Sequence, residues 1–272
     1  MNGDMLKKRI ITAIFIVVYI GLMIYFGGWF YNLSVLIFAF IGMHEIYAAL
    51  HKGGYNPVTT IGYLFILIFY FFLRSEKDLG GILTIILATI TSLSIPVFNP
   101  KVSPLDSALT ILSFIYPGII SLCLIFLKSN CELYGNYLVI LTFLTTWASD
   151  TFAYLIGSKF GKIKLNPAIS PKKTIEGSIG GLVGSTVAGL IIGLFYNNYF
   201  SIDLALIHYT IIGLLAGIFG QLGDLTASCI KRFCNVKDFG KILPGHGGIM
   251  DRFDSILFAL PIVFTYYFLF LT

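Results

Sequence analysis

The sequence predicts an all-α integral membrane protein whose transmembrane helices follow one another along the chain. Of its 272 residues, 57% are hydrophobic and only 11% are charged, whereas soluble domains carry roughly 25% charged residues. Apolar runs long enough to cross a bilayer recur from one end to the other. These observations exclude a soluble globular fold and a disordered chain, and four cysteines are too sparse for a secreted disulfide scaffold.

Nine segments approach the roughly 20 helical residues that about 30 Å of hydrocarbon requires. The first follows three basic residues, as in a signal peptide, but it lacks a small-residue cleavage site, so we expect an uncleaved anchor. The third is the shortest. We expect a polytopic helix bundle with spans near residues 10–26, 29–50, 60–73, 80–98, 105–127, 135–156, 177–196, 203–227 and 253–271.

The placement of lysine and arginine predicts the orientation of these spans. If the amino terminus lies in the cytosol, fifteen of the eighteen basic residues fall on the cytosolic side, and only Arg74, Lys77 and Lys128 fall outside. Cytosolic loops of membrane proteins carry the excess of basic residues. We therefore expect a cytosolic amino terminus and, with nine spans, a carboxyl terminus on the opposite side.

Polar residues divide the chain into two expected regions. Residues 1–134 are expected to form amino-terminal scaffold helices. Residues 135–272 are expected to form the catalytic half, because its two long cytosolic loops, 157–176 and 228–252, hold ten of the eighteen basic residues. Function should therefore be sought in these two loops and in the helices beside them.

The helices of the second half are expected to pack against protein rather than lipid, because polar or small residues recur on one face of each. The sixth span carries a polar stripe of Thr142, Thr145, Thr146, Ser149, Asp150, Ala153, Tyr154 and Gly157. Small-residue seams follow on the next two spans, with Gly177, Gly181, Ser185, Gly189 and Gly193 on the seventh and Gly213, Gly217 and Gly220 on the eighth.

Several carboxylates lie near the cytosolic ends of spans. A carboxylate inside the bilayer costs about 2.5–3.5 kcal/mol at its centre, so each needs a partner or a purpose. Asp150 and Asp224 lie toward the ends of their spans, and Asp251 and Asp254 open the last one, where a helix amino terminus also favours an acid. Glu45, with the histidine before it, is interpreted as an interfacial pair.

The loop between Asp224 and Asp251 has the composition of a phosphate site. The glycine-rich run Gly245–Gly248 would let backbone N–H groups approach an anion, and the start of the following helix would add its positive end. Two carboxylates from different helices suit Mg²⁺, which takes oxygen ligands together with substrate phosphates. The pattern therefore indicates metal-assisted phosphoryl or nucleotidyl transfer.

Other site classes find no support in the sequence. The run from Gly157 to Lys162 lacks the spacing and the final hydroxyl of a P-loop, and no G-x-S-x-G marks a serine hydrolase. The cysteines form no C-x-x-C pair. The basic residues are too scattered for a nucleic-acid surface, so nucleic acid is not an expected partner.

The string S-x-x-K-R-x₄-K-D-x-G-x₂-L-P-G-H-G-G-x-x-D-R-x-D, from Ser228 to Asp254, resembles the signature of the phosphatidate cytidylyltransferases, the CDP-diacylglycerol synthases. About ten fixed polar or glycine positions in 27 residues make it specific. Upstream, Ser149–Thr151 and the run from Ser170 to Gly177 resemble the same family. The similarity covers the carboxyl-terminal half, while the amino-terminal half matches only as hydrophobic helix.

The resemblance implies transfer of a cytidylyl group from CTP to phosphatidic acid, giving CDP-diacylglycerol and pyrophosphate, with Mg²⁺. The positions of Asp224 and Asp251 suggest that these two residues hold one or two metal ions. The resemblance also implies an enzyme of the cytoplasmic membrane with its active site facing the cytosol, and a homodimer is possible. Asp150 and Lys237 are further catalytic candidates. The candidate phosphate-binding residues are Lys172, Lys173, Lys231, Arg232, His246, Gly247, Gly248 and Arg252.

Three alternatives remain open at the level of the sequence. A related membrane enzyme could act on another lipid, as polyprenol kinases and archaeal CDP-lipid synthases do, because fixed motifs do not read acyl chains. A secondary transporter would also explain acids and glycine-interrupted helices, but it favours acids at the bilayer midplane and repeated halves. A purely structural membrane protein has no need of the 228–254 string.

Overall fold

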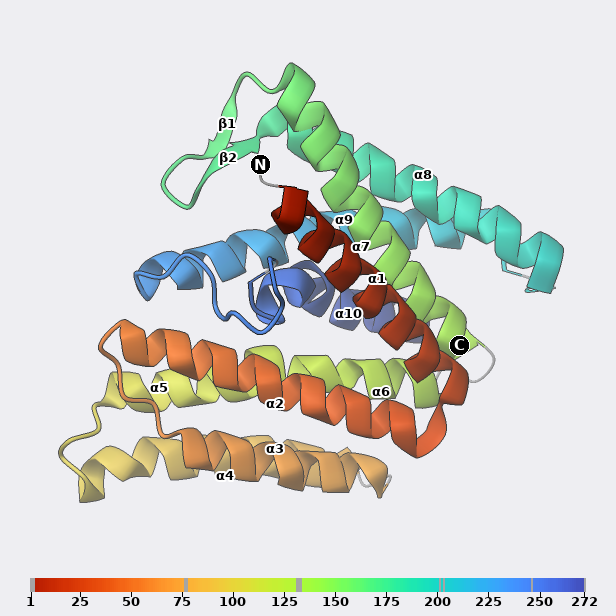
Figure 1. Ribbon diagram of the computed structural model, residues 1–272. Helices are drawn as coiled ribbons and strands as arrows, with labels where there is room; N and C mark the ends of the chain where they lie inside the picture. Colours follow the sequence, from red (N-terminus) through yellow and green to blue (C-terminus); the bar gives the residue numbers. More distant parts are fainter. Residues whose placement is uncertain are drawn as a thin grey trace. The chain divides into compact units, whose positions relative to one another are not determined.

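The computed structural model describes residues 3–75, 78–130, 134–200, 202, 204–245 and 247–271 (Figure 1). Most of these residues are helical, as expected from the sequence. Seven described helices are long and apolar enough to cross a membrane, and two shorter apolar helices, Ile10–Phe26 and Thr59–Arg74, coincide with the first and third expected spans. The protein is therefore a helical, polytopic chain, and the total of nine spans stays a prediction.

The chain forms two compact units. The first comprises Met1–Ile125 and Lys231–Arg252, and the second comprises Phe126–Ile230 and Phe253–Thr272. The loop that carries the signature string thus folds with the amino-terminal helices, although it follows the eighth span in sequence. Backbone groups at residues 249 and 250 are hydrogen-bonded to Glu45 on the second helix, which holds the segment in this unit.

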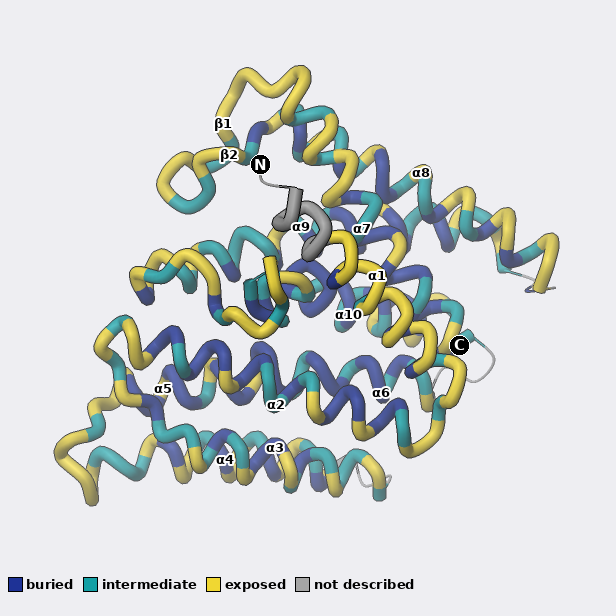
Figure 2. The backbone as a smooth tube through the Cα atoms, in the orientation of Figure 1, coloured by how far each residue is buried: buried dark blue, intermediate teal, exposed yellow. Residues whose placement is uncertain are grey.

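The first unit is built on α2, Gly28–Lys52, whose buried residues run along its length (Figure 2). The other helices of this unit are α1 (Gly3–Phe26), α3 (Thr59–Arg74), α4 (Asp78–Phe98), α5 (Pro104–Ser113), the π-helix η1 (Phe114–Ile119) and the start of α6 (Ile120–Asn130). The π-helix contains Pro117, which has no backbone N–H and so interrupts the regular hydrogen-bond ladder of this span. Ser103 and Asp106 form a capping box at the start of α5.

The second unit contains α7 (Gly135–Phe160), α8 (Ile175–Phe200), most of α9 (Leu206–Phe233) and most of α10 (Met250–Phe270). The small-residue seams are confirmed. A Cβ atom at Gly177 would lie 2.8 Å from the carbonyl oxygen of Ala153 on α7, and one at Gly213 would lie 2.5 Å from that of Ser185 on α8. Because α7 and α9 of the same unit fill the seams of α8, these glycines give no support to contacts between chains.

The polar stripe of α7 is confirmed in part. The hydroxyls of Thr142, Thr145 and Thr146 are buried and donate to carbonyl oxygens one turn earlier, and Ser149 is buried as well. The expectation is wrong for Asp150, which is exposed, and for Tyr154, which is 75% exposed, whereas Ala153 and Gly157 in the same turns face glycines of α8. Internal hydrogen bonds to the helix allow the threonines to be buried, whereas a carboxylate and a phenol need outside partners.

The loop expected at 157–176 is shorter and more ordered than the sequence suggests. It also contains two short β-strands, which an all-α fold does not have. Helix α7 continues to Phe160, and an antiparallel hairpin of β1 (Lys164–Asn166) and β2 (Ser170–Thr174) leads into α8. The Thr174 hydroxyl accepts the N–H of Gly177 and caps α8, while the Glu176 carboxylate accepts the N–H of Ile163. The hairpin is thereby fixed at both ends.

The second loop is shortened in the same way. Helix α9 runs to Phe233, so that Lys231 and Arg232 lie in its last turn, and α10 already begins at Met250, so that Asp251 lies in its first turn. Between them the chain turns back at Leu243 and Gly247, which exchange backbone hydrogen bonds.

Candidate functional site

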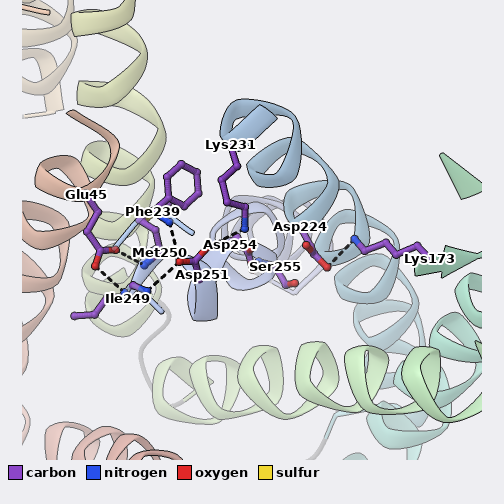
Figure 3. Close-up of polar contacts among 11 residues, drawn as sticks. Glu45, Lys173, Asp224, Lys231, Phe239, Ile249, Met250, Asp251, Asp254 and Ser255 are labelled. Atoms are coloured by element: carbon purple, nitrogen blue, oxygen red, sulfur yellow. Dashed lines mark hydrogen bonds and ion pairs between the residues drawn. The ribbon is translucent and has the colours of Figure 1, made fainter. Parts of the chain in front are cut away.

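Asp251 is the centre of a network of contacts in the first unit (Figure 3). Its Oδ1 atom lies 2.8 Å from Nζ of Lys231, and its Oδ2 atom accepts the N–H groups of Phe239 and Gly248, each at 2.9 Å. The Asp251 side chain is only 3% exposed. These four residues, Lys231, Phe239, Gly248 and Asp251, are called the Asp251 cluster.

Lys231 is held in place from two sides. Its ammonium pairs with Asp251, and Nζ also lies 5.2 Å from the centroid of the Phe239 ring, within reach of a cation–π interaction. The Phe239 side chain is buried. The cluster thus joins the end of α9, the middle of the loop and the start of α10 through one carboxylate.

The glycines of the loop are required by this arrangement. Gly247 adopts a φ of +88°, a conformation that residues with a Cβ atom rarely take, and a Cβ there would lie 2.9 Å from Oδ2 of Asp251. The loop can therefore wrap the Asp251 carboxylate closely only because this position carries no side chain.

Glu45 contacts the Asp251 region in a way that sequence reasoning missed. Its side chain, on α2, is buried, and its carboxylate accepts the N–H of Ile249 at 3.0 Å and that of Met250 at 2.8 Å (Figure 3). The interpretation as a pair with His44 does not give its hydrogen-bond partners, which are backbone groups at the start of α10. A carboxylate inside an otherwise apolar span was the one signal that could have found it.

The proposed use of the loop amides also needs correction. In this structure the N–H of Gly247 donates to the carbonyl of Leu243, that of Gly248 to Asp251, and those of the next two residues to Glu45. These donors are already paired, so they do not form the open anion cradle that the glycine pattern suggested. Binding of phosphate at Gly247 and Gly248 stays a prediction, without support from free amides.

Asp224 has a different environment, in the second unit. Its Oδ2 atom lies 2.6 Å from Nζ of Lys173, which stands on β2, and the two side chains are 32% and 27% exposed (Figure 3). An ion pair this open to solvent contributes little to stability, at most about 1 kcal/mol. Asp224 is therefore more accessible than Asp251 and less constrained in orientation.

Two further acids lie in the second unit. The carboxylate of Asp150 is 3.5 Å from the Ser255 hydroxyl, the outer limit for a hydrogen bond, whereas Asp254 is buried and accepts the N–H of Ser255 at 2.9 Å. Asp150 is thus the exposed acid of the two, and Asp254 the buried one.

The remaining basic candidates are on the surface. Four of them are exposed: Lys172 on β2, and Arg232, Lys237 and Arg252 at or near the loop 234–249. Long, exposed cationic side chains suit the binding of phosphate groups. His246 lies outside the described residues.

The donor set is compatible with Mg²⁺. Among the described residues no group of three or more His, Cys, Asp or Glu could hold a metal ion, but Mg²⁺ commonly binds one or two carboxylates together with water and substrate phosphates. In Asp251 two backbone N–H groups orient one oxygen while the other faces a cation, the ammonium of Lys231. Asp224 likewise faces an ammonium. In this structure an ammonium occupies one oxygen of each carboxylate, so the fit to Mg²⁺ rests on the oxygen chemistry of the two side chains and not on these ion pairs.

Comparison with known proteins agrees with the signature string. The cytidylyltransferase family matches residues 7–270. A phosphatidate cytidylyltransferase of Staphylococcus saprophyticus is 36% identical over 268 residues, which is 95% of this chain and 97% of that protein. Those of Staphylococcus haemolyticus and Staphylococcus aureus strain COL are each 41% identical, over 60% of this chain and 60% of their own length. Because the match extends over nearly the whole sequence, the chain belongs to the cytidylyltransferase family.

Proposed function

We propose that the protein transfers the cytidylyl group of CTP to phosphatidic acid, forming CDP-diacylglycerol and pyrophosphate for phospholipid biosynthesis. The observation that carries this proposal is the match over 95% of the chain to a protein named phosphatidate cytidylyltransferase. The two groups of paired acids and lysines, around Asp251 and around Asp224, supply the charges that a reaction between two phosphate compounds needs.

In the proposed reaction an oxygen of the phosphatidate phosphate attacks the α-phosphorus of CTP. The bond from that phosphorus to the bridging oxygen of the β-phosphate breaks, and pyrophosphate leaves with the electron pair. The attacking oxygen is already anionic, so no strong general base is needed. The main requirement is to hold two anionic substrates together and in line, which is a task for cationic side chains and fixed positions.

Asp224 and Asp251 are the proposed ligands of one or two Mg²⁺ ions. When bound, such ions neutralise the charge that builds up on the α-phosphate and on the departing pyrophosphate. The Asp251 carboxylate is held for this role by the N–H groups of Phe239 and Gly248. Asp150 is proposed to complete the ligand set or to hold a lysine.

The basic residues named above are proposed to bind the phosphates of the two substrates. Arginines suit a two-pronged grip on a phosphate, and lysines act as point charges. The proposed phosphate-binding set is Lys172, Lys173, Lys231, Arg232, Lys237, His246 and Arg252.

The proposed setting is the cytoplasmic membrane, with nine spans, the amino terminus in the cytosol and the active site on the cytosolic side. The excess of basic residues on that side supports this orientation. The substrates support a cytosolic active site as well, because CTP is a soluble nucleotide and the phosphate of phosphatidic acid lies at the membrane surface. Assembly as a homodimer stays a prediction.

The test is transfer of ³²P from α-labelled CTP into a lipid-extractable product by the purified protein. Labelling that requires phosphatidic acid and disappears with EDTA is the expected result. Labelling with another lipid acceptor but not with phosphatidic acid would contradict the substrate. Labelling that persists in EDTA would contradict the metal.

A further inference from the structure

A buried carboxylate from the amino-terminal half reaches the loop that carries the signature string. Glu45 lies on α2 and is only 2% exposed, although α2 is one of the helices able to span a membrane. Burial of a carboxylate is costly unless hydrogen bonds or a charge compensate it. Its compensation comes from the N–H groups of Ile249 and Met250, one to each oxygen.

The loop is shaped around this carboxylate. A Cβ atom at Gly248 would lie 2.5 Å from Oε2 of Glu45, and one at Gly240 would collide with Oε1. One turn before Glu45 on α2, a Cβ at Gly42 would lie 3.0 Å from the sulfur of Met250. Glycines on both sides of the contact thus allow α2, the loop and the start of α10 to meet closely.

Glu45 and Asp251 share the same short stretch of backbone. The N–H of Gly248 donates to Asp251, while the N–H groups of the next two residues donate to Glu45 (Figure 3). Asp251 directly follows Met250. A shift of Glu45 would therefore shift Met250, which is next to Asp251. The Oδ1 atom of Asp251 would then point in another direction.

We propose that Glu45 is a positioning residue for the transferase reaction: it fixes the loop 239–249 and the first turn of α10 so that Asp251 and Lys231 are presented in a set orientation. The proposal rests on the proposed function. In this proposal the amino-terminal half affects the reaction by orienting Asp251 and Lys231. It does so through backbone hydrogen bonds and not through contact with substrate.

A carboxylate is required at this position because two N–H donors converge on it. Glutamine would offer one acceptor oxygen and would turn its NH₂ group toward the second donor. Aspartate keeps both acceptors on a side chain shorter by one methylene. Misplacement of catalytic groups by about 1 Å can lower a rate roughly 100-fold. The loss of activity should therefore depend on how many acceptor oxygens residue 45 offers and on how far they reach.

The test compares Glu45→Gln and Glu45→Asp with the wild type by two measurements. Hydrogen exchange of peptides covering residues 247–252 is expected to be at least about tenfold faster in Glu45→Gln. Its kcat is expected to fall at least about tenfold with KM for CTP changed less than about threefold, because groups acting in the transition state are misplaced. Glu45→Asp is expected to be intermediate in both.

Asp106→Asn is the matched control. Asp106 is a buried acid of the same unit, 6% exposed, and it accepts the N–H groups of Asn56 and Ser103, away from the signature loop. This variant should lose stability but keep the wild-type kcat and wild-type exchange at 247–252. The proposal is overturned if Glu45→Gln leaves kcat and the exchange at 247–252 unchanged. It is also overturned if Asp106→Asn changes these two quantities as much as Glu45→Gln does.

Failure of the proposed function would be recognised separately, because the exchange measurement needs no substrate. A wild-type protein without transferase activity would refute the reaction, whatever Glu45 does. If the wild-type protein is active, and Glu45→Gln has the same kcat and the same slow exchange at 247–252, only the positioning role is refuted.

Discussion

The two aspartates proposed as metal ligands differ in how they are held. Asp251 has three donors and almost no exposure, whereas Asp224 has one lysine partner and is about one third exposed. Both charges matter for the proposed chemistry, but only that of Asp251 also organises the chain around it. Substitutions at the two positions should therefore have the same effect on turnover and different effects on stability.

Asp224→Asn and Asp251→Asn are each expected to lower turnover at least roughly 100-fold, because each removes a negative charge proposed to hold Mg²⁺. Label transfer from CTP to lipid measures this. Lys52→Ala, an exposed change at the end of α2, should leave turnover unchanged. Normal activity in either aspartate variant would remove that residue from the metal site.

The two lysine partners give a matched comparison of stability. Lys231→Met leaves the Asp251 carboxylate buried without its counter-ion, a change that costs about 3–5 kcal/mol in buried pairs. Lys173→Met breaks a pair that is open to solvent and should cost at most about 1 kcal/mol. Denaturant unfolding in detergent compares them. Equal losses would show that Asp251 does not depend on Lys231.

At the scale of the elements, helix ends and helix seams decide where the site residues lie. Extension of α9 to Phe233 and of α10 back to Met250 converts both ends of the expected loop 228–252 into helix. Lys231 and Asp251, which form the ion pair of the Asp251 cluster, are thereby placed on helices. In the second unit, the hairpin carries Lys173, and the glycine seams set how closely α8 approaches α7 and α9.

Gly213→Ala tests the seam between α8 and α9. The added methyl would meet the carbonyl oxygen of Ser185 at 2.5 Å, and overpacking of this kind costs about 1–3 kcal/mol. The same change at Gly21 on α1 meets nothing within 4 Å and should be neutral or slightly stabilising. Melting temperatures in detergent compare the two variants, and that of Gly213→Ala is expected to be lower. Equal melting temperatures would mean that the seam can relax.

At the scale of the whole molecule, the contacts of the chain do not follow its order. Residues Lys231–Arg252 form part of the unit that begins at Met1, because Glu45 and the other contacts of the loop draw it to the amino-terminal helices. The amino-terminal half therefore does more than contribute apolar spans. One of its carboxylates holds the segment on which the family signature lies.

The proposed topology predicts that the two ends of the chain lie on opposite sides of the membrane. A reporter fused to the amino terminus should be active only in the cytosol, and one fused to the carboxyl terminus should be active only on the other side, because nine spans is an odd number. If both reporters behave as cytosolic, the number of spans is even. The shorter helix Thr59–Arg74 would then be the first to re-examine.

The sequence by itself determined the helical class, the positions of the apolar segments, the small-residue seams and the family. Apolar length, residue spacing and a fixed string are local properties, and they survive without knowledge of distant contacts. Tertiary structure alone decided the roles of Glu45, Phe239 and the loop amides, since Glu45 meets residues some 200 positions away and the loop folds back on Asp251. Whether a buried acid or an N–H group is free or paired depends on what folds against it, and no local pattern records that.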